Sequence, residues 1–134
     1  MPIKLAIGLG NPGPRYRNTY HSAGHLAIDY WESHRTDLPL PITHYALRKS
    51  NVFMNESGPF VAAALRKRRL KPENLLLVHD DSDIALGRFK LSFGRGAAGH
   101  RGVMSVIASL GTMGFTRLRI GVRRNRSREK YSIV

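Results

Sequence analysis

Apolar runs and alternating segments along the chain predict a series of short strands. Lys4–Leu9 and Leu75–Val78 are short apolar runs, so both are expected to be buried strands. Leu47–Phe53 is compatible with another strand. Arg88–Phe93 and Phe115–Val122 alternate between apolar and polar residues, which is typical of strands with one exposed face.

Helical spacing of apolar positions is found between these strands. The predicted helices are Ser22–His34, Pro59–Leu70 and Val103–Leu110. Ser22 is the expected cap of the first helix, and Asn55 or Ser57 that of the second. Leu38–Ile42, with its prolines, and Gly94–Gly102, with its glycines, are expected loops. Strands that alternate with helices predict an α/β fold whose mixed, mainly parallel sheet is flanked by helices.

The length of 134 residues allows one hydrophobic core and not two, so residues 1–134 are predicted to form a single domain. No apolar run approaches the roughly 18 residues of a membrane span, and the N-terminus lacks the features of a signal peptide. The chain has no cysteine, which excludes disulfides, thiolate zinc sites and a cysteine nucleophile. A reducing, cytoplasmic location is therefore expected.

Positive charge dominates the chain and is concentrated in its last third. The sequence has 22 Lys+Arg and 9 Asp+Glu, a formal net charge of +13, so a polyanion such as nucleic acid is the expected partner. The segment Ile84–Arg128 has no acidic residue. Within it, Arg117, Arg119 and Arg123 are predicted to share one face of a strand. The alternative is a basic surface that is only solvated.

Residues 6–21, AIGLGNPGPRYRNTYH, contain the Gly-x-Gly-x-x-Gly spacing of a dinucleotide-binding loop. Such a loop needs a helix that begins at its second or third glycine, so that the helix N-terminus meets the pyrophosphate. Here the prolines on both sides of Gly13 delay the helix to about Ser22. A nicotinamide cofactor is therefore not expected. The segment instead presents Asn11 and His21 near the end of a strand.

Candidate residues for hydrolytic chemistry follow from residue type. An imidazole titrates near neutral pH, so His21 can act as a general base for a water molecule that attacks an ester. The base needs a partner that orients it, and Asp80, Asp81 and Asp83 follow a buried strand, where α/β sheets place their sites. The spacing does not choose among them. A metal site is not expected at these residues. His79 is expected to be a buried, hydrogen-bonded histidine.

A series of sequence blocks covers nearly the whole chain in a recognisable order. They are GLGNPGPRY, TYHSAG, Phe53-Met54-Asn55 with Ser57-Gly58, LLLVHDDSD, Leu86-Gly87, Gly94–Gly102 and RLRIGV. In this order they resemble the bacterial-type peptidyl-tRNA hydrolase family. The resemblance implies cleavage of the ester that joins a peptide to the 3′ ribose of tRNA, which frees tRNA from dropped-off translation products. It also implies tRNA as partner, a cytoplasmic or organellar location, a monomer, and no metal or organic cofactor.

The resemblance also assigns roles to residues. It makes His21 the catalytic base and chooses Asp80 as its acidic partner. The substrate-binding residues that we expect are Asn11, Tyr16, Met54, Asn55 and Arg101. The expected contacts to tRNA phosphates are Lys90, Arg95, Arg119 and Arg123. For Met54 the alternative is a core methionine.

Three departures from the family pattern affect these expectations. The family has asparagine after the histidine of its glycine-rich loop, whereas this chain has Arg101, which can donate but not accept a hydrogen bond. A family lysine that contacts phosphate aligns with Ser92. The family's C-terminal helix is absent, so the chain is expected to be truncated and to leave apolar surface uncovered. A non-catalytic RNA-binding relative of the same fold is therefore the alternative function.

Overall fold

The computed structural model describes residues 2–16, 19–34 and 46–124. Its sheet has five strands in the order β2-β1-β3-β5-β4. The strands are β1 (Leu5–Gly8), β2 (Ala46–Lys49), β3 (Leu75–Ala85), β4 (Phe89–Phe93) and β5 (Thr116–Arg123). All neighbouring pairs are parallel except β4 and β5. The predicted mixed, mainly parallel α/β sheet is confirmed.

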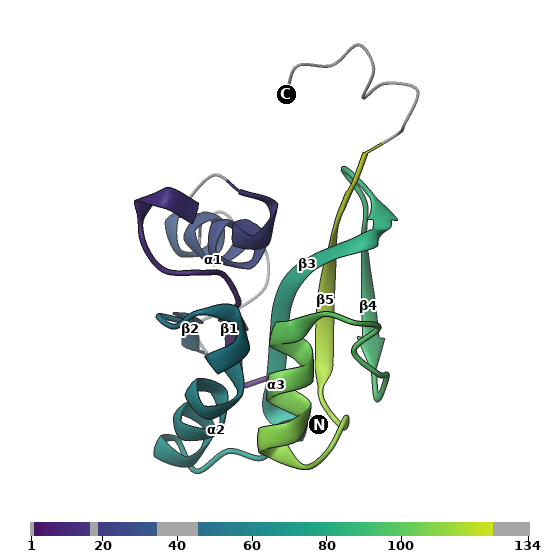
Figure 1. The fold of residues 1–134 in the computed structure, drawn as a ribbon. Helices are drawn as coiled ribbons and strands as arrows, with labels where there is room; N and C mark the ends of the chain where they lie inside the picture. Colours follow the sequence, from purple (N-terminus) through teal and green to yellow (C-terminus); the bar gives the residue numbers. More distant parts are fainter. Residues whose placement is uncertain (1, 17–18, 35–45, 125–134) are drawn as a thin grey trace.

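Helices cover both faces of this sheet (Figure 1). They are α1 (Ala23–Ser33), α2 (Ser57–Lys67) and α3 (Arg101–Leu110). Valines and leucines of α2 and α3 pack against β1 and β3 in the larger core cluster, and α1 packs on the opposite face through Ile28. Because both faces are covered, β1 is buried along its whole length. Within the described ranges no helix is long and apolar enough to cross a membrane.

The strand β3 is longer than the sequence predicted. Its eleven residues continue through His79 and Asp80 to Ala85, so the acidic residues lie within the strand and do not follow it. Parallel pairing with β5 extends to Asp81, and a register shift separates it from the next pair at Ala85. The apolar run alone could not show this, because the backbone of β5 satisfies the hydrogen bonds of polar and apolar residues alike.

Ser22 occupies the predicted cap position of α1, without a side-chain cap bond, whereas the starts of α2 and α3 differ from prediction. The cap position of α2 is Glu56, without a side-chain cap bond, so neither Asn55 nor Ser57 caps this helix. The Ser57 hydroxyl instead donates to the Met54 carbonyl at 2.7 Å. The helix α3 begins at Arg101, earlier than predicted, because His100 caps it. The expected loop at residues 38–42 lies outside the described residues.

Close backbone contact sets the position of α1 on the sheet. A Cβ atom on Gly24 would lie 2.4 Å from the Val78 carbonyl oxygen, and one on Gly8 would lie 2.2 Å from the Gly24 carbonyl oxygen. Only glycine permits this approach of helix and strands. The short 3₁₀ turn η2 (Tyr20–Ser22) precedes α1 directly and is in contact with β3. This packing brings His21, in the middle of η2, to the C-terminal half of β3.

An apolar strip is exposed on the edge strand β4. Phe89, Leu91 and Phe93 are 60–68% exposed. Their partners in β5 include Leu118 and Ile120, and these two pack on the same side of the sheet as α1. Residues directly opposite in an antiparallel pair share a face. The strip therefore continues the apolar surface of the α1 side to the edge of the sheet.

Candidate active site

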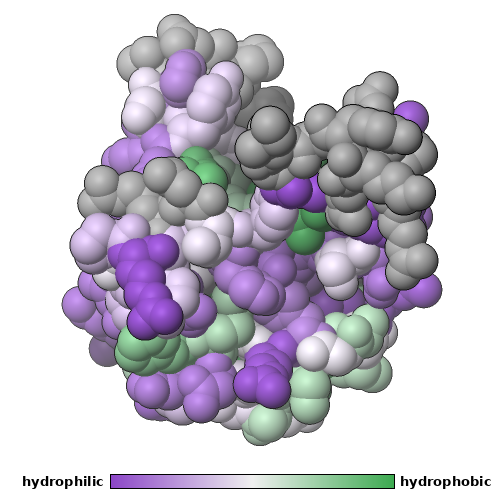
Figure 2. Space-filling model, turned by 45° about the horizontal axis from the view of Figure 1, so that its top comes forward, coloured by the Kyte–Doolittle hydropathy of each residue, from purple (hydrophilic) through white to green (hydrophobic). Residues whose placement is uncertain are grey.

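A cleft of about 530 Å³ lies beside the C-terminal half of β3. The turn η2, the segment after β1 and the loop before α3 also contribute to its walls. Its lining includes Asn11, His21, Met54, Asp80, Asp81, His100 and Arg101. Figure 2, in which the top of the molecule comes forward, shows that hydrophilic residues predominate in the middle of this face.

Asp80 contacts two imidazoles with its two carboxylate oxygens. Its Oδ2 lies 2.9 Å from Nδ1 of His21, and its Oδ1 lies 2.8 Å from Nε2 of His100. The side chain of Asp80 is 6% exposed and that of His21 is 63% exposed. A buried carboxylate therefore holds a histidine that faces solvent. His21 and Asp80, which the family resemblance assigns to one site, lie side by side.

The cap of α3 determines the tautomer of His100. Nδ1 of His100 accepts the backbone N–H of Val103 at 3.2 Å, so the ring proton must be on Nε2. Nε2 then donates to Asp80. This histidine is a hydrogen-bond donor to the carboxylate, with both ring nitrogens engaged. No role was predicted for it, because the helix was expected to begin only at Val103, three residues later.

The same carboxylate leaves a free nitrogen on His21. When Nδ1 of His21 donates to Asp80, the lone pair of a neutral ring is on Nε2. Among the described residues no hydrogen bond to this Nε2 is present. The turn that carries the ring is itself held by the Tyr16 carbonyl, which accepts from the hydroxyls of Thr19 and Ser22. His21 thus has the free nitrogen and the orientation that a general base requires.

The surroundings of Asp80 keep it charged. Burial acts to raise the pKa of Asp80, but the hydrogen bond and charge of His100, together with the charge of His21, outweigh burial and hold the pKa below its usual value. A carboxylate that stays ionised can both fix the His21 tautomer and stabilise the imidazolium that forms when His21 takes up a proton.

Distance alone would also allow a metal ion here. One ligand atom each of His21, Asp80 and His100 lies within 4.8 Å of the others. To ligate a metal through Nε2, a neutral His100 would need its proton on Nδ1, which faces the N–H of Val103. The donor set of the described residues therefore suits a hydrogen-bonded carboxylate better than a metal ion.

His79 lies directly behind this group and is 1% exposed. Its Nδ1 is 2.8 Å from the Asp80 carbonyl oxygen, and its ring packs against His100 with centroids 4.7 Å apart. Burial and then the charge of His100 lower the pKa of His79 to about 4. Its Nε2 has no hydrogen-bond partner among the described residues. The expectation of a buried histidine is correct, but only one of its two ring nitrogens is hydrogen-bonded.

Asn11 and Met54 form one wall of the cleft. Oδ1 of Asn11 accepts the backbone N–H of Met54 at 2.8 Å, which leaves the amide N–H₂ of Asn11 available as a donor. Met54 is 8% exposed and packs with the larger core cluster while also lining the cleft. Both interpretations of Met54, site wall and core residue, therefore describe it in part.

Two expected substrate-binding residues lie outside the cleft lining. Asn55 is exposed, and its backbone carbonyl accepts the Ser105 hydroxyl. Tyr16 packs edge-on against Phe53 at 6.2 Å between ring centroids. Arg101, in contrast, lines the cleft next to His100 and is exposed. A role of Asn55 or Tyr16 in binding requires a ligand that extends beyond the cleft.

The predicted basic face is divided in the structure. Arg117 is 4% exposed, and its guanidinium donates to the Gly96 carbonyl at 2.9 Å, so it is not part of a polyanion surface. Arg119 pairs with Asp81 at 2.7 Å and also donates to Ser92 at 3.0 Å. Its predicted phosphate contact would have to compete with that carboxylate. Because both side chains of the ion pair are largely buried, the attraction between Asp81 and Arg119 is stronger than in an exposed pair, and a phosphate competes less easily for Arg119.

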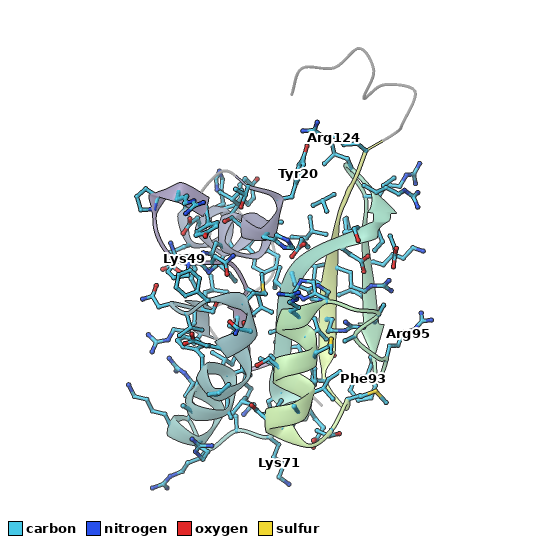
Figure 3. All side chains as sticks on the ribbon, viewed as in Figure 1. Tyr20, Lys49, Lys71, Phe93, Arg95 and Arg124 are labelled. Atoms are coloured by element: carbon cyan, nitrogen blue, oxygen red, sulfur yellow. The ribbon has the colours of Figure 1, made fainter. Side chains whose placement is uncertain are left out.

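The other three predicted phosphate contacts are accessible. Lys90 and Arg123 line a second hollow of about 500 Å³. Asp83 lines both this hollow and the cleft, so the two adjoin. Arg123 also donates to the Asp83 carbonyl at 3.0 Å. Arg95 is exposed and points away from the ribbon in Figure 3. Lys90 and Arg123 therefore lie beside the cleft, and the accessible cations do not share one strand face.

Comparison with known proteins relates most of the chain to a single protein family. The sequence model of the family described as peptidyl-tRNA hydrolase matches residues 5–133. The chain is 41% identical to the peptidyl-tRNA hydrolase of Geotalea uraniireducens (strain Rf4), and the match covers 92% of this chain and 72% of that protein. For the enzyme of Aquifex aeolicus (strain VF5) the identity is 38%, with 96% and 74% covered. The crystal structure of peptidyl-tRNA hydrolase from Acinetobacter baumannii is similar with a TM-score of 0.77 at 30% identity and covers 96% of this chain.

Proposed function

The chain belongs to the peptidyl-tRNA hydrolase family, and from this premise we propose that it hydrolyses the ester bond between peptide and tRNA in peptidyl-tRNA. The observation that carries the proposal is the pairing of His21 with the buried carboxylate of Asp80, which leaves Nε2 of His21 free. This pairing supports a mechanism in which His21 activates a water molecule and no side chain acts as a nucleophile.

The proposed reaction uses these groups in two steps. Nε2 of His21 takes a proton from water as the water oxygen forms a bond to the ester carbonyl carbon. Asp80 holds the Nδ1 proton and stabilises the imidazolium. The bond from carbon to the ribose 3′ oxygen then breaks, and His21 returns its proton to that oxygen. The products are a peptide with a free carboxylic acid, which loses its proton to solvent, and a tRNA with a free 3′ hydroxyl.

Binding of this substrate is supported by the groups around the base. The free amide N–H₂ of Asn11 is a donor suited to the ester carbonyl or to the tetrahedral intermediate. Lys90 and Arg123 beside the cleft, and Arg95, are accessible cations that suit phosphates of the tRNA backbone. We propose that the protein acts as a monomer in the cytoplasm and contacts tRNA without reading its sequence.

A non-catalytic RNA-binding function is the second candidate, and Arg101 is the observation that favours it. Its permanently charged side chain lines the cleft beside His100, where it cannot accept a hydrogen bond from a catalytic water. Under this alternative the basic residues bind RNA while the ester is not cleaved.

One preparation of the protein can separate the two functions. Release of labelled peptide from an N-blocked peptidyl-tRNA is measured beside binding of deacylated tRNA. Hydrolysis that depends on protein concentration supports the enzyme. Tight tRNA binding without release of peptide above the rate of buffer alone would support the RNA-binding alternative instead.

A further inference from the structure

A contact between Tyr20 and Arg124 joins two distant parts of the chain. The guanidinium of Arg124 lies over the ring of Tyr20, 4.9 Å from its centroid, and its Nε donates to the tyrosine hydroxyl. The two residues are 104 positions apart in sequence. In Figure 3 they meet at the upper end of the molecule, above the gap between the ribbon of α1 and that of β5.

The position of this contact relates directly to the proposed base. Tyr20 precedes His21 in the three-residue turn η2. Arg124 follows the last residue of β5, and β5 pairs with β3 at Asp80. The contact therefore connects the segment that carries the base with the strands that carry its carboxylate.

The turn is packed on its C-terminal side, where Ser22 is buried and α1 follows directly, but the side chain of His21 itself has few contacts. Its side chain is 63% exposed, and its partners among the described residues are the Asp80 carboxylate and the ring of His100, at 6.4 Å between centroids. The hydrogen bonds of the turn to the Tyr16 carbonyl are local and do not reach β3 or β5. A base must stay within hydrogen-bond distance of both its carboxylate and its water.

We propose that Tyr20 and Arg124 are positioning residues that act as a pair: their contact fixes η2 across the cleft and so holds His21 on Asp80. The kinetic part of this inference rests on the proposed ester hydrolysis. The structural part is that the contact of Tyr20 with Arg124 holds the ring of the next residue, His21, in place. This part does not depend on the activity.

Two simpler roles give different expectations. If Arg124 only contacts a tRNA phosphate, a lysine in its place retains most of the binding, and Tyr20 is irrelevant. If Tyr20 only stacks on a base of the tRNA, removal of its hydroxyl has no effect and removal of the ring raises KM. A positioning pair instead affects kcat, and its two members depend on each other.

The test uses the full chain with Tyr20→Phe, Tyr20→Leu, Arg124→Lys and the double variant Tyr20→Leu/Arg124→Lys. Tyr20→Phe removes the hydrogen bond and keeps the ring, and Arg124→Lys keeps the charge and loses the planar donor. Matched controls are Tyr30→Phe, an exposed tyrosine on α1, and Arg66→Lys, an exposed arginine near the end of α2. Thermal unfolding of each variant checks that it is folded.

We expect kcat to fall about 10- to 100-fold in Tyr20→Leu and Arg124→Lys, because small misplacements of a catalytic group have effects of this size. Tyr20→Phe should lie between these variants and wild type. The double variant should be no slower than the slower single variant, while KM and the Kd for tRNA stay within about twofold. Unchanged kcat, effects confined to KM, or additive losses in the double variant would overturn the proposal.

A second measurement needs no activity. The exchange rate of the His21 Nδ1 proton with water, followed by NMR, should rise in Tyr20→Leu and Arg124→Lys because the hydrogen bond to Asp80 is held less firmly. It should remain at the wild-type value in the two controls. If wild type does not hydrolyse peptidyl-tRNA, the proposed function fails, and this exchange rate alone decides the positioning role: equal rates in wild type and variants reject it.

Discussion

Asp80 determines what the neighbouring histidines can do. It accepts from both His21 and His100, whose tautomer the cap of α3 determines, and of these two rings only His21 has a nitrogen without a hydrogen bond among the described residues. The sequence supplied three adjacent carboxylates and no physical reason to choose one. The choice depends on the pleat of β3, which directs neighbouring side chains to opposite faces and brings Asp80 to η2 and Asp81 to Arg119.

Arg101 is the residue in the cleft whose chemistry opposes the proposed reaction most directly. Because arginine lacks an acceptor and carries a permanent charge, we predict that Arg101→Asn hydrolyses peptidyl-tRNA about 100-fold or more faster than wild type, the size of effect seen when one oriented polar group is gained. The measurement is the single-turnover rate of ester cleavage.

The control for this prediction is Arg101→Met, which removes the charge and adds no acceptor. A gain in the asparagine variant alone assigns the effect to the hydrogen bond. Equal gains in both variants would assign it to the charge. If neither is faster and wild type is already efficient, the guanidinium does not hinder the water.

At the scale of elements, the pairing of β3 with β5 brings an acidic and a basic side chain together next to the cleft. Asp81 on β3 and Arg119 on β5 form an ion pair whose side chains are only 12% and 15% exposed. Burial acts to raise the pKa of Asp81, but the hydrogen bond from Arg119 and that from the Asp83 backbone keep the pKa below its usual value. Asp81 therefore remains charged and keeps Arg119 from an incoming phosphate.

We predict that Asp81→Asn strengthens tRNA binding by releasing Arg119. The slope of log K against log salt should steepen by roughly 0.7 to 0.9, which is one additional phosphate contact. Asp29→Asn, which breaks the exposed pair between Asp29 and Lys49, serves as control and should leave the slope unchanged. Weaker binding in Asp81→Asn, or an equal change in both variants, would show that Arg119 does not take part in tRNA binding.

The elements themselves were predictable to different degrees. Apolar runs and periodicity located β1, the helices and both members of the β4–β5 pair, because spacing of apolar residues follows the type of element, although the apolar face of β4 is exposed. The polar half of β3 and the start of α3 at Arg101 were not predicted. Both depend on partners that are distant in sequence or on backbone geometry: β5 for the strand, and the cap formed by His100 for the helix.

At the scale of the whole molecule, the buried His79 couples the site to stability. The imidazole has an ordinary pKa of 6.5, which burial and the charge of His100 lower to about 4 in the folded protein. Between these pH values the unfolded chain binds a proton at His79 that the folded protein does not, so stability decreases as pH falls. The contribution is fully present above pH 6.5 and is lost as pH approaches 4.

We predict that the free energy of unfolding of wild type falls by roughly 3 kcal/mol between pH 6.5 and 4 through His79 alone. His79→Asn keeps a donor for the Asp80 carbonyl and cannot be protonated, so its free energy should decline less over the same range. Urea unfolding at several pH values measures both proteins, and data at pH 7.5 show the effect of the substitution itself. Parallel curves for the two proteins would contradict the prediction.

The most direct measurement of the proposed chemistry is the single-turnover hydrolysis of peptidyl-tRNA by wild type and His21→Ala, with the Kd for tRNA determined on the same samples. We predict that the rate falls by at least about 100-fold, because a positioned base is lost, while Kd changes by less than about twofold, because the imidazole contacts no phosphate. A His21→Ala variant that hydrolyses the ester at the wild-type rate would contradict the assignment of His21 as the base.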